Sequence, residues 1–250
     1  MKKIVGCLAL ISTLIMACVP PSEEIKSDVV LDVKDPTIQT ILDFQDRLQT
    51  DSLYPYLRSQ DPTLVYLAIR AFASIQDRQT VDSIIGFLDH NNMDIRSIAA
   101  YAIGQIGDEK ATSALIDNFL DKDTLDVDNV LNSNILEALG KISNEAIMTN
   151  IASVESYRPD DTLLILGQNR ALYRFGLRNI KTNDATQAAL KYTLDNQYPR
   201  SARLISANYL ARNRDLDISL QVDDLVKTFK LESDPNIRIC LLYTSDAADD

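Results

Sequence analysis

Hydrophobic residues recur with a helical period between Asp94 and Leu120. The first half of this stretch carries Ile95, Ile98, Ala99, Ala102, Ile103 and Ile106, which share one face of a helix. Gly107 then stands where a helix end favours a positive φ, and Asp108 is a suitable N-cap for a second helix. The second half carries Ala111, Leu115, Ile116, Phe119 and Leu120. The pattern predicts two short helices joined by a tight turn, and neither is long enough to be stable alone in water.

The same pattern returns along the chain. One copy lies 31 positions before Ile95 to Asp108 and another lies 36 positions after it, with looser copies at 163–194 and 200–226. A further copy begins at Asp234. A spacing of roughly 30–40 residues with two helices per unit is typical of a helical solenoid. We therefore predict an all-α fold, an α-solenoid or superhelix of stacked antiparallel helix pairs.

Two segments carry the clearest repeat motif. They are AAYAIGQIGD at 99–108 and LEALGKISN at 136–144. They resemble short HEAT-like repeats of the kind found in bilin lyases, and the resemblance covers roughly residues 61–238. The first copy has Ala73 and Gln76 where Gly104 and Gly107 stand, so the sequence does not decide the conformation of the turn between its two helices. This resemblance implies a fold more than a function, because such repeats serve many roles.

The N-terminus reads as a targeting segment. Residues 1–17 have two lysines followed by an apolar run, and the sequence LIMAC that ends at Cys18 resembles a bacterial lipobox. The resemblance implies cleavage before Cys18 and acylation of its thiol; the alternative is an ordinary signal peptide with an unrelated cysteine. Residues 18–34 are polar and proline-containing, which predicts a flexible tether. We expect a lipid-anchored protein of the bacterial cell envelope, at the outer membrane.

The remaining boundaries follow from the repeats. Residues 35–60 form a divergent unit that starts with Asp-Pro, and we interpret them as N-terminal capping helices. Residues 61–239 form the solenoid, with about five repeats and the start of a sixth. Residues 240–250, CLLYTSDAADD, resemble the translation of a sequencing-library adapter. We therefore expect an artefactual tail and a native chain that continues beyond Ile239.

Composition excludes several functions. The formal net charge of −11 argues against a nucleic-acid partner. A single histidine, His90, gives no second imidazole for a transition-metal site. The acidic run 121–128 lacks the glycine and closing glutamate of a calcium loop, and we interpret it and 158–161 as solvated loops. We predict no metal, no cofactor and no catalytic residue in this chain.

One cluster of residues is a candidate for partner binding. Arg170, Arg174 and Arg178 recur every four residues with Tyr173 among them, so the arginines lie on one helical face. One interpretation is a docking strip for an acidic or extended partner, with arginine and tyrosine as anchors. The alternative is ion pairing between neighbouring repeats. The candidate carboxylates for that pairing are Asp160, Asp161, Asp184 and Asp215.

The sequence leaves three candidate functions. The first is a membrane-anchored, non-catalytic scaffold that binds a protein or peptide on its concave face. The second rests on a resemblance of the lipobox and repeats to exported lipoproteins with a C-terminal cyclophilin-type domain. It implies that the full-length protein is a peptidyl-prolyl isomerase and that this part binds clients. The third is a bilin lyase, which the lipobox and the lack of an acid–base pair disfavour.

Overall fold

The computed structural model describes residues 27–119, 129–154 and 162–246, and the regular structure of these residues is entirely helical. The first helix of each pair is α1 (Pro36–Asp46), α3 (Pro62–Ile75), α5 (Met93–Ile106), α7 (Asn129–Ile142), α9 (Thr162–Leu177), α11 (Arg200–Arg212) or the final α13 (Pro235–Asp246). The second helix is α2 (Thr50–Leu53), α4 (Val81–Ile85), α6 (Thr112–Asp117), α8 (Glu145–Ala152), α10 (Asn183–Leu194) or α12 (Val222–Leu231). Short 3₁₀ turns, Tyr54–Arg58 and Gly86–Asp89, extend α2 and α4.

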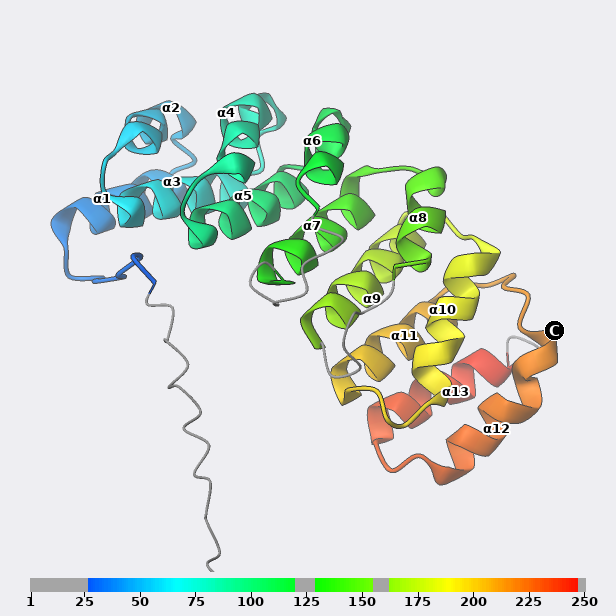
Figure 1. Ribbon diagram of the computed structural model, residues 1–250. Helices are drawn as coiled ribbons and strands as arrows, with labels where there is room; N and C mark the ends of the chain where they lie inside the picture. Colours follow the sequence, from blue (N-terminus) through cyan, green and yellow to red (C-terminus); the bar gives the residue numbers. More distant parts are fainter. Residues whose placement is uncertain (1–26, 120–128, 155–161, 247–250) are drawn as a thin grey trace, which may run out of the picture.

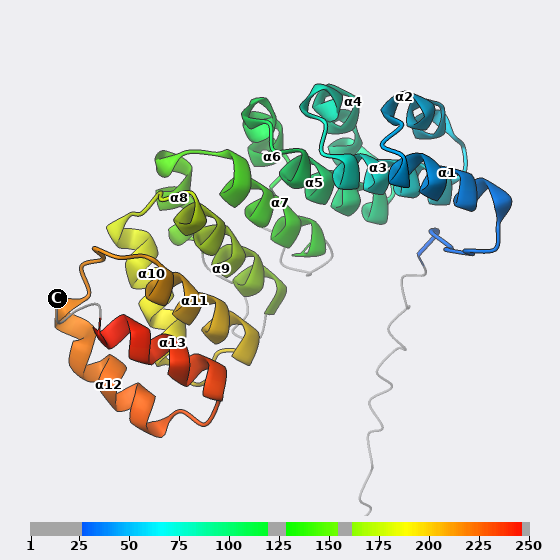
Figure 2. The same ribbon diagram turned by 180° about the vertical axis from the view of Figure 1, so that it is seen from behind.

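The helix pairs stack side by side into a curved superhelix (Figure 1). The first helices follow one another along the inner side of the arc, and the second helices α2, α4, α6 and α8 follow its outer side. The view from behind shows the same arrangement (Figure 2). The prediction of an all-α solenoid of antiparallel helix pairs is confirmed.

In the described residues, most of the core is one continuous band of apolar side chains that runs from Ile38 to Leu241. Ile165, Tyr192 and Ala202 form a small second cluster. In α5 the predicted stripe is buried as expected: Ile95, Ala99, Ala102 and Ile103 are fully inaccessible to solvent and Ile106 is nearly so. Burying one such isoleucine contributes roughly 1.5–3 kcal/mol relative to exposure. Because each stripe is covered by both neighbouring pairs, most of the helical stability comes from packing between repeats.

The helix ends follow local sequence rules. Asp35 caps α1 by accepting hydrogen bonds from the amides of Thr37 and Ile38, with Pro36 at the first helical position. Gly107 ends α5 with φ of 78°, as predicted. Gln76 ends α3 with φ of 60°, so the first copy makes the same left-handed turn without a glycine.

Three glycines let the first helices approach one another closely. A Cβ on Gly104 would lie 2.8 Å from the Cα of Ala138, and one on Gly140 would lie 2.6 Å from the Cα of Ala171. Gly167 meets Ser133 in the same way, at 2.6 Å. These positions face neighbouring backbone, which cannot move aside without separating the helices.

Residues 27–34, which we placed in the tether, lie against the solenoid. The amide of Val30 donates to Thr63 Oγ1 at 3.0 Å, at the start of α3. The side-chain amide of Asn92 donates to Asp28 at 3.3 Å, at the start of α5. Figure 1 shows this segment on the inner side of the arc. The lipidation and tether predictions for residues 1–26 lie outside the described residues.

The first residues of the predicted artefactual tail belong to α13. Cys240, Leu241 and Thr244 are buried, and the Thr244 hydroxyl donates to the carbonyl of Cys240 at 2.9 Å. These residues extend the apolar face that begins at Ile237. The identification of 240–250 with an adapter translation stays a prediction.

The close approach of α7 and α9 at Gly140 predicts that a larger side chain there lowers stability. Gly140→Ala forces α7 and α9 apart, so we expect the free energy of unfolding to fall by about 1–3 kcal/mol. Gly86→Ala is the matched control, because a Cβ there meets nothing within 4 Å. We expect the control to be neutral or stabilised by about 0.4–1 kcal/mol. Urea denaturation followed by circular dichroism measures both; equal effects would contradict the packing account.

Candidate functional site

The inner side of the arc contains a shallow hollow between α3, α5 and α7. Its volume is about 370 Å³, and Tyr66, Arg70, Tyr101 and Asn134 are among the residues that line it. Tyr101 is 40% exposed although it stands in the middle of α5. The Lys141 ammonium lies 5.7 Å from the centre of the Tyr101 ring, within reach of a cation–π interaction. Lys141 thus lies between the hollow, where it contacts Tyr101, and Glu137 on α7.

Three cations converge on Glu137 beside this hollow. Arg174 donates to Glu137 Oε1 through Nη2 at 2.8 Å and through Nε at 3.1 Å. Lys141 Nζ lies 3.3 Å from the same oxygen, and Arg170 Nη1 lies 3.8 Å from Oε2. We call the hollow and this cluster together the inner face. Among the described residues of the inner face, the cations are Arg70, Lys141, Arg170 and Arg174, and the carboxylates are Asp94 and Glu137. Asp28 lies beside Asp94, bonded to Asn92, and the described cations still outnumber the described carboxylates.

The cluster shifts the ionisation of its own members. Burial raises the pKa of Glu137, but the hydrogen bond from Arg174 and the charges of Lys141 and Arg174 outweigh this, and the pKa lies below its ordinary value. For Lys141, burial lowers the pKa; the attraction of Glu137 offsets this only in part, and Arg174 and Arg170 lower it further. Arg174 therefore favours the ionised form of Glu137 but disfavours the charged form of Lys141.

The predicted docking residues divide into two groups. Arg170 and Arg174 meet at Glu137, as described, and Arg170 keeps 44% of its side chain exposed. Arg178 instead donates from Nη1 to the carbonyls of Gly140 and Ser143, at 3.2 and 2.7 Å, and so caps the end of α7. Tyr173 packs against the core. Their role in binding a partner stays a prediction.

Pairing between repeats does occur, through a carboxylate that the sequence interpretation missed. Asp184 lines a groove on the other side of the molecule, whereas Glu137 lies one repeat before Arg174. The sequence did contain one indication of this carboxylate: Glu137 and Lys141 are four residues apart, which places them side by side on a helix. Asp160 and Asp161 lie outside the described residues, as does the acidic run 121–128.

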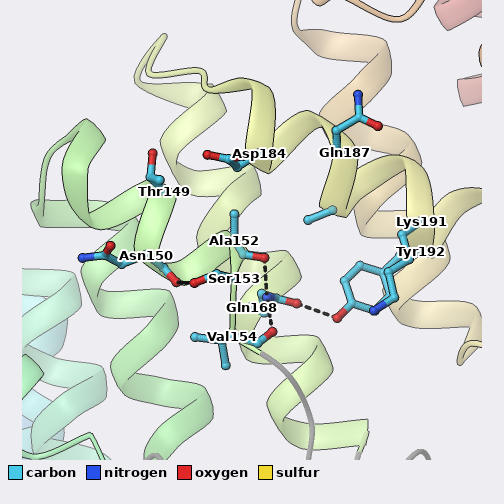
Figure 3. Close-up of a pocket in the computed structure, with 11 residues that line it drawn as sticks. Thr149, Asn150, Ala152, Ser153, Val154, Gln168, Asp184, Gln187, Lys191 and Tyr192 are labelled. Atoms are coloured by element: carbon cyan, nitrogen blue, oxygen red, sulfur yellow. Dashed lines mark hydrogen bonds between the residues drawn. The ribbon is translucent and has the colours of Figure 1, made fainter. Parts of the chain in front are cut away.

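A second recess lies on the outer side, between α8 and α10 (Figure 3). Its volume is about 460 Å³, and it is lined by α8 residues, α10 residues and Gln168 of α9. The buried Gln168 amide donates to the carbonyls of Ile151 and Val154 at 2.8 and 2.7 Å, and its oxygen accepts from the Tyr192 hydroxyl at 2.5 Å. Gln168 thereby fixes the end of α8 to both neighbouring helices. The sequence gives no periodic signal for this residue.

The described lining of both surfaces consists mainly of polar, aromatic and charged side chains. Nowhere in residues 27–119, 129–154 and 162–246 do three His, Cys, Asp or Glu side chains gather as metal ligands would. The same residues contain no helix with the length and apolar character needed to cross a bilayer. What these surfaces offer is hydrogen-bonding groups, aromatic rings and fixed charge.

Comparisons with known proteins agree with the fold. Residues 50–140 match the HEAT-repeat family model. The phycocyanin lyase complex of CpcE and CpcF from Nostoc sp. PCC7120 is similar in structure, with a TM-score of 0.51 and 16% identity over 84% of this chain and 88% of that chain. An engineered protein is similar with a TM-score of 0.52 and 16% identity, over 85% of this chain and 61% of that one. No curated protein matches the sequence. At this identity the likeness concerns the fold alone.

The Glu137 cluster predicts a pH-dependent stability. Glu137→Gln should lower the free energy of unfolding by about 1–3 kcal/mol at pH 7, because it removes a charge-assisted hydrogen bond. The folded-state pKa is lowered, so this contribution is complete above the ordinary value of 4.5 and is lost as pH falls through the folded value. The difference between the variant and the parent should therefore shrink below pH 4.5.

Urea denaturation at pH 7, 5, 4 and 3 measures this difference. Glu145→Gln, on the exposed first turn of α8, is the matched control and should change stability by less than about 1 kcal/mol at each pH. A Glu137→Gln deficit that stays constant down to pH 3 would show that the ion cluster does not account for it.

Proposed function

We propose that this chain is a non-catalytic protein-binding scaffold whose inner face binds an acidic, extended segment of a partner. The observation that carries the proposal is the excess of positive charge on the inner face of a chain whose net charge is −11. Tyrosine and arginine side chains beside a hollow are typical of the residues that contribute most to protein interfaces. A curved stack of repeats supplies the extended surface that such a partner needs.

The arginines on and beside the inner face differ in how strongly they are bonded within the fold. Arg174 and Arg178 already bond to α7, so their removal affects stability first. Arg70 is exposed and Arg170 is half exposed, so both contribute positive charge to the surface and less to the stability of the fold. Replacing these two arginines is therefore the cleaner test of binding.

We also propose that Cys18 is acylated and holds the scaffold at the bacterial outer membrane. The support is the LIMAC sequence and the polar segment that follows it. Eight residues, 19–26, would then separate the acylated Cys18 from Ser27, a span of about 30 Å when fully extended. The inner face would lie close to the membrane surface, because the chain leaves the solenoid on that side (Figure 1).

The alternative of an exported peptidyl-prolyl isomerase requires a catalytic domain in addition to the helical repeats of residues 27–119, 129–154 and 162–246. No observation on the described residues favours it over a scaffold. A bilin lyase activity is not proposed either, since 16% identity to the phycocyanin lyase complex carries only the fold.

Cross-linking tests the scaffold proposal. A photoreactive benzoylphenylalanine in place of Tyr101 should give a discrete adduct with an envelope protein in cells. The double variant Arg70→Glu with Arg170→Glu should reduce this adduct at least tenfold. Lys227→Glu with Lys230→Glu, on exposed positions of α12, changes the net charge equally and should leave it intact. An adduct that survives inner-face reversal, or is lost equally in the control, would refute the proposal.

Lipidation has a separate test. Metabolic labelling with an alkyne fatty acid should label the parent chain, whereas Cys18→Ser should remove the label and release the protein from the membrane fraction. Mass spectrometry of the mature N-terminus should show a modified cysteine. An unmodified Cys18, or cleavage elsewhere, would contradict the anchor and leave the scaffold proposal standing.

A further inference from the structure

A short segment of the chain itself lies at the edge of the inner hollow. Residues 27–30, which we call the strap, cross the N-terminal ends of α3 and α5 on the inner side of the arc (Figure 1). The amide of Val30 donates to Thr63 Oγ1 at 3.0 Å, and Asp28 accepts from the side-chain amide of Asn92 at 3.3 Å. The strap therefore bridges two successive repeats.

The first residue of the strap is bonded to the wall of the hollow. Ser27 Oγ donates to Asp94 Oδ2 at 2.5 Å, and Asp94 is one of the residues that line the hollow. The same hydroxyl accepts from the amide of Val29 at 3.1 Å. From Val30 to Ser27 the chain thus passes from the start of α3 to the start of α5. The residues that precede Ser27 begin at the rim of the hollow.

The chain before the strap is long enough to enter the hollow. Tyr101 is seven residues after Asp94 on α5, which places it about 10 Å further along the helix. Glu24 is three residues before Ser27 and can lie up to about 10 Å from it when the chain is extended. Lys141 Nζ is 5.7 Å from the centre of the Tyr101 ring. The preceding residues can therefore reach both the tyrosine and the ammonium while the strap stays bonded.

The sequence of this preceding segment complements the inner face. Residues 22–26 read SEEIK, with two adjacent carboxylates and one isoleucine. The described cations of the inner face outnumber its described carboxylates, and the hollow has apolar walls at Ile98 and Val130. Val130 is 46% exposed, so an apolar side chain placed there would remove its surface from water. The segment thus has the same chemistry as the acidic, extended partner proposed above.

We propose that residues 22–26 occupy the inner face when no partner is bound, and that they regulate the scaffold by competing with its partner. Glu23 and Glu24 lie among the cations that include Arg70 and Lys141, and the isoleucine lies against the apolar wall of the hollow. This inference rests on the proposed function, because the segment and the partner use the same face. A partner binds only as the segment leaves.

The single lysine of the segment does not oppose this placement. Lys26 directly precedes Ser27 in the chain. The carboxylates of Asp28 and Asp94 are both close to Ser27, one as its neighbour in sequence and the other through a hydrogen bond. The lysine charge is compensated there, so both glutamates remain for the cations of the inner face.

Such an occupant is always present but weakly held. Because the segment is joined to the strap, its effective concentration at the hollow is in the millimolar range expected for a short flexible link. Exposed ion pairs are individually weak, and salt screens them. A partner that adds contacts along further repeats can therefore displace the segment.

Photo-cross-linking of the purified full chain tests the occupancy without any partner. Benzoylphenylalanine in place of Tyr101 should form an internal cross-link to residues 22–26, located by mass spectrometry of peptides from the monomer. The same photoprobe in place of Leu220, a position that is 88% exposed on the far part of the solenoid, is the matched control. It should form no cross-link to this segment.

Neutralising the segment tests the role of charge. Glu23→Gln with Glu24→Gln should reduce the internal cross-link from position 101 at least threefold. Asp223→Asn with Asp224→Asn, at exposed positions of α12, changes the net charge equally and should leave the yield unchanged. Thermal melting should show that both double variants fold like the parent.

The same photoprobe measures the competition in cells. When Glu23 and Glu24 are neutralised, the adduct between position 101 and an envelope protein should rise at least threefold as the internal cross-link falls. Ser27→Ala with Asp28→Ala, which releases the strap from α5, should act in the same direction. The α12 control variant should change neither product.

The outcomes separate this inference from the proposed function. Absence of the internal cross-link, or a cross-link that neutralising the glutamates does not reduce, would overturn the inference and leave the scaffold proposal standing. Loss of the internal cross-link without a rise in the partner adduct would overturn the competition. An internal cross-link with no partner adduct in any variant would refute the scaffold function, and with it the regulation, while the occupancy of the inner face would stand.

Discussion

The contact between successive first helices is the constraint on which the structure depends. Gly104 brings α5 against α7, and Gly140 and Gly167 bring α7 against α9, where a side chain of any size would keep the helices apart. Close contact of this kind gives full dispersion contacts along the whole interface, and it places each apolar stripe under its neighbours. No pair is stable without the next, so stability belongs to the stack.

The first helices pack closely on the inner side of the arc and the second helices pack more loosely on the outer side. This difference explains the character of the inner and outer surfaces. The first helices, drawn together, form the continuous inner face on which Tyr101, Lys141 and Glu137 meet. The second helices lie on the longer outer path of the arc and are shorter in the first repeats (Figures 1 and 2). An apolar slot between α6 and α8 lies on this outer path. Curvature thus produces a charged inner face and a gapped outer one.

Much of the fold could be predicted because its signals are local. The apolar stripe of α5, the Asp35–Pro36 start and the Gly107 turn each depend on a few adjacent residues. The partner of Arg174 could not be predicted in this way. In a solenoid the nearest surface residue is one repeat away, and which residue it is depends on the rotation of both helices about their axes. Three of the four carboxylates nominated from the sequence, Asp160, Asp161 and Asp184, lie within 14 positions of Arg174, whereas Glu137 is 37 positions before it. The fourth, Asp215, is distant in the chain but belongs to a following repeat. The Gln168 network and the outer slot were missed for the same reason.

The inner-face cluster also shows why structural and binding roles are hard to separate in such a protein. One carboxylate, Glu137, satisfies Arg174 and attracts Lys141 and Arg170, so it stabilises the stack and still leaves the surface positive. A second carboxylate at this point would stabilise the cluster further but cancel the charge that distinguishes the face from the rest of an acidic chain. Under the proposed scaffold function, this excess is the charge that an acidic partner segment would neutralise.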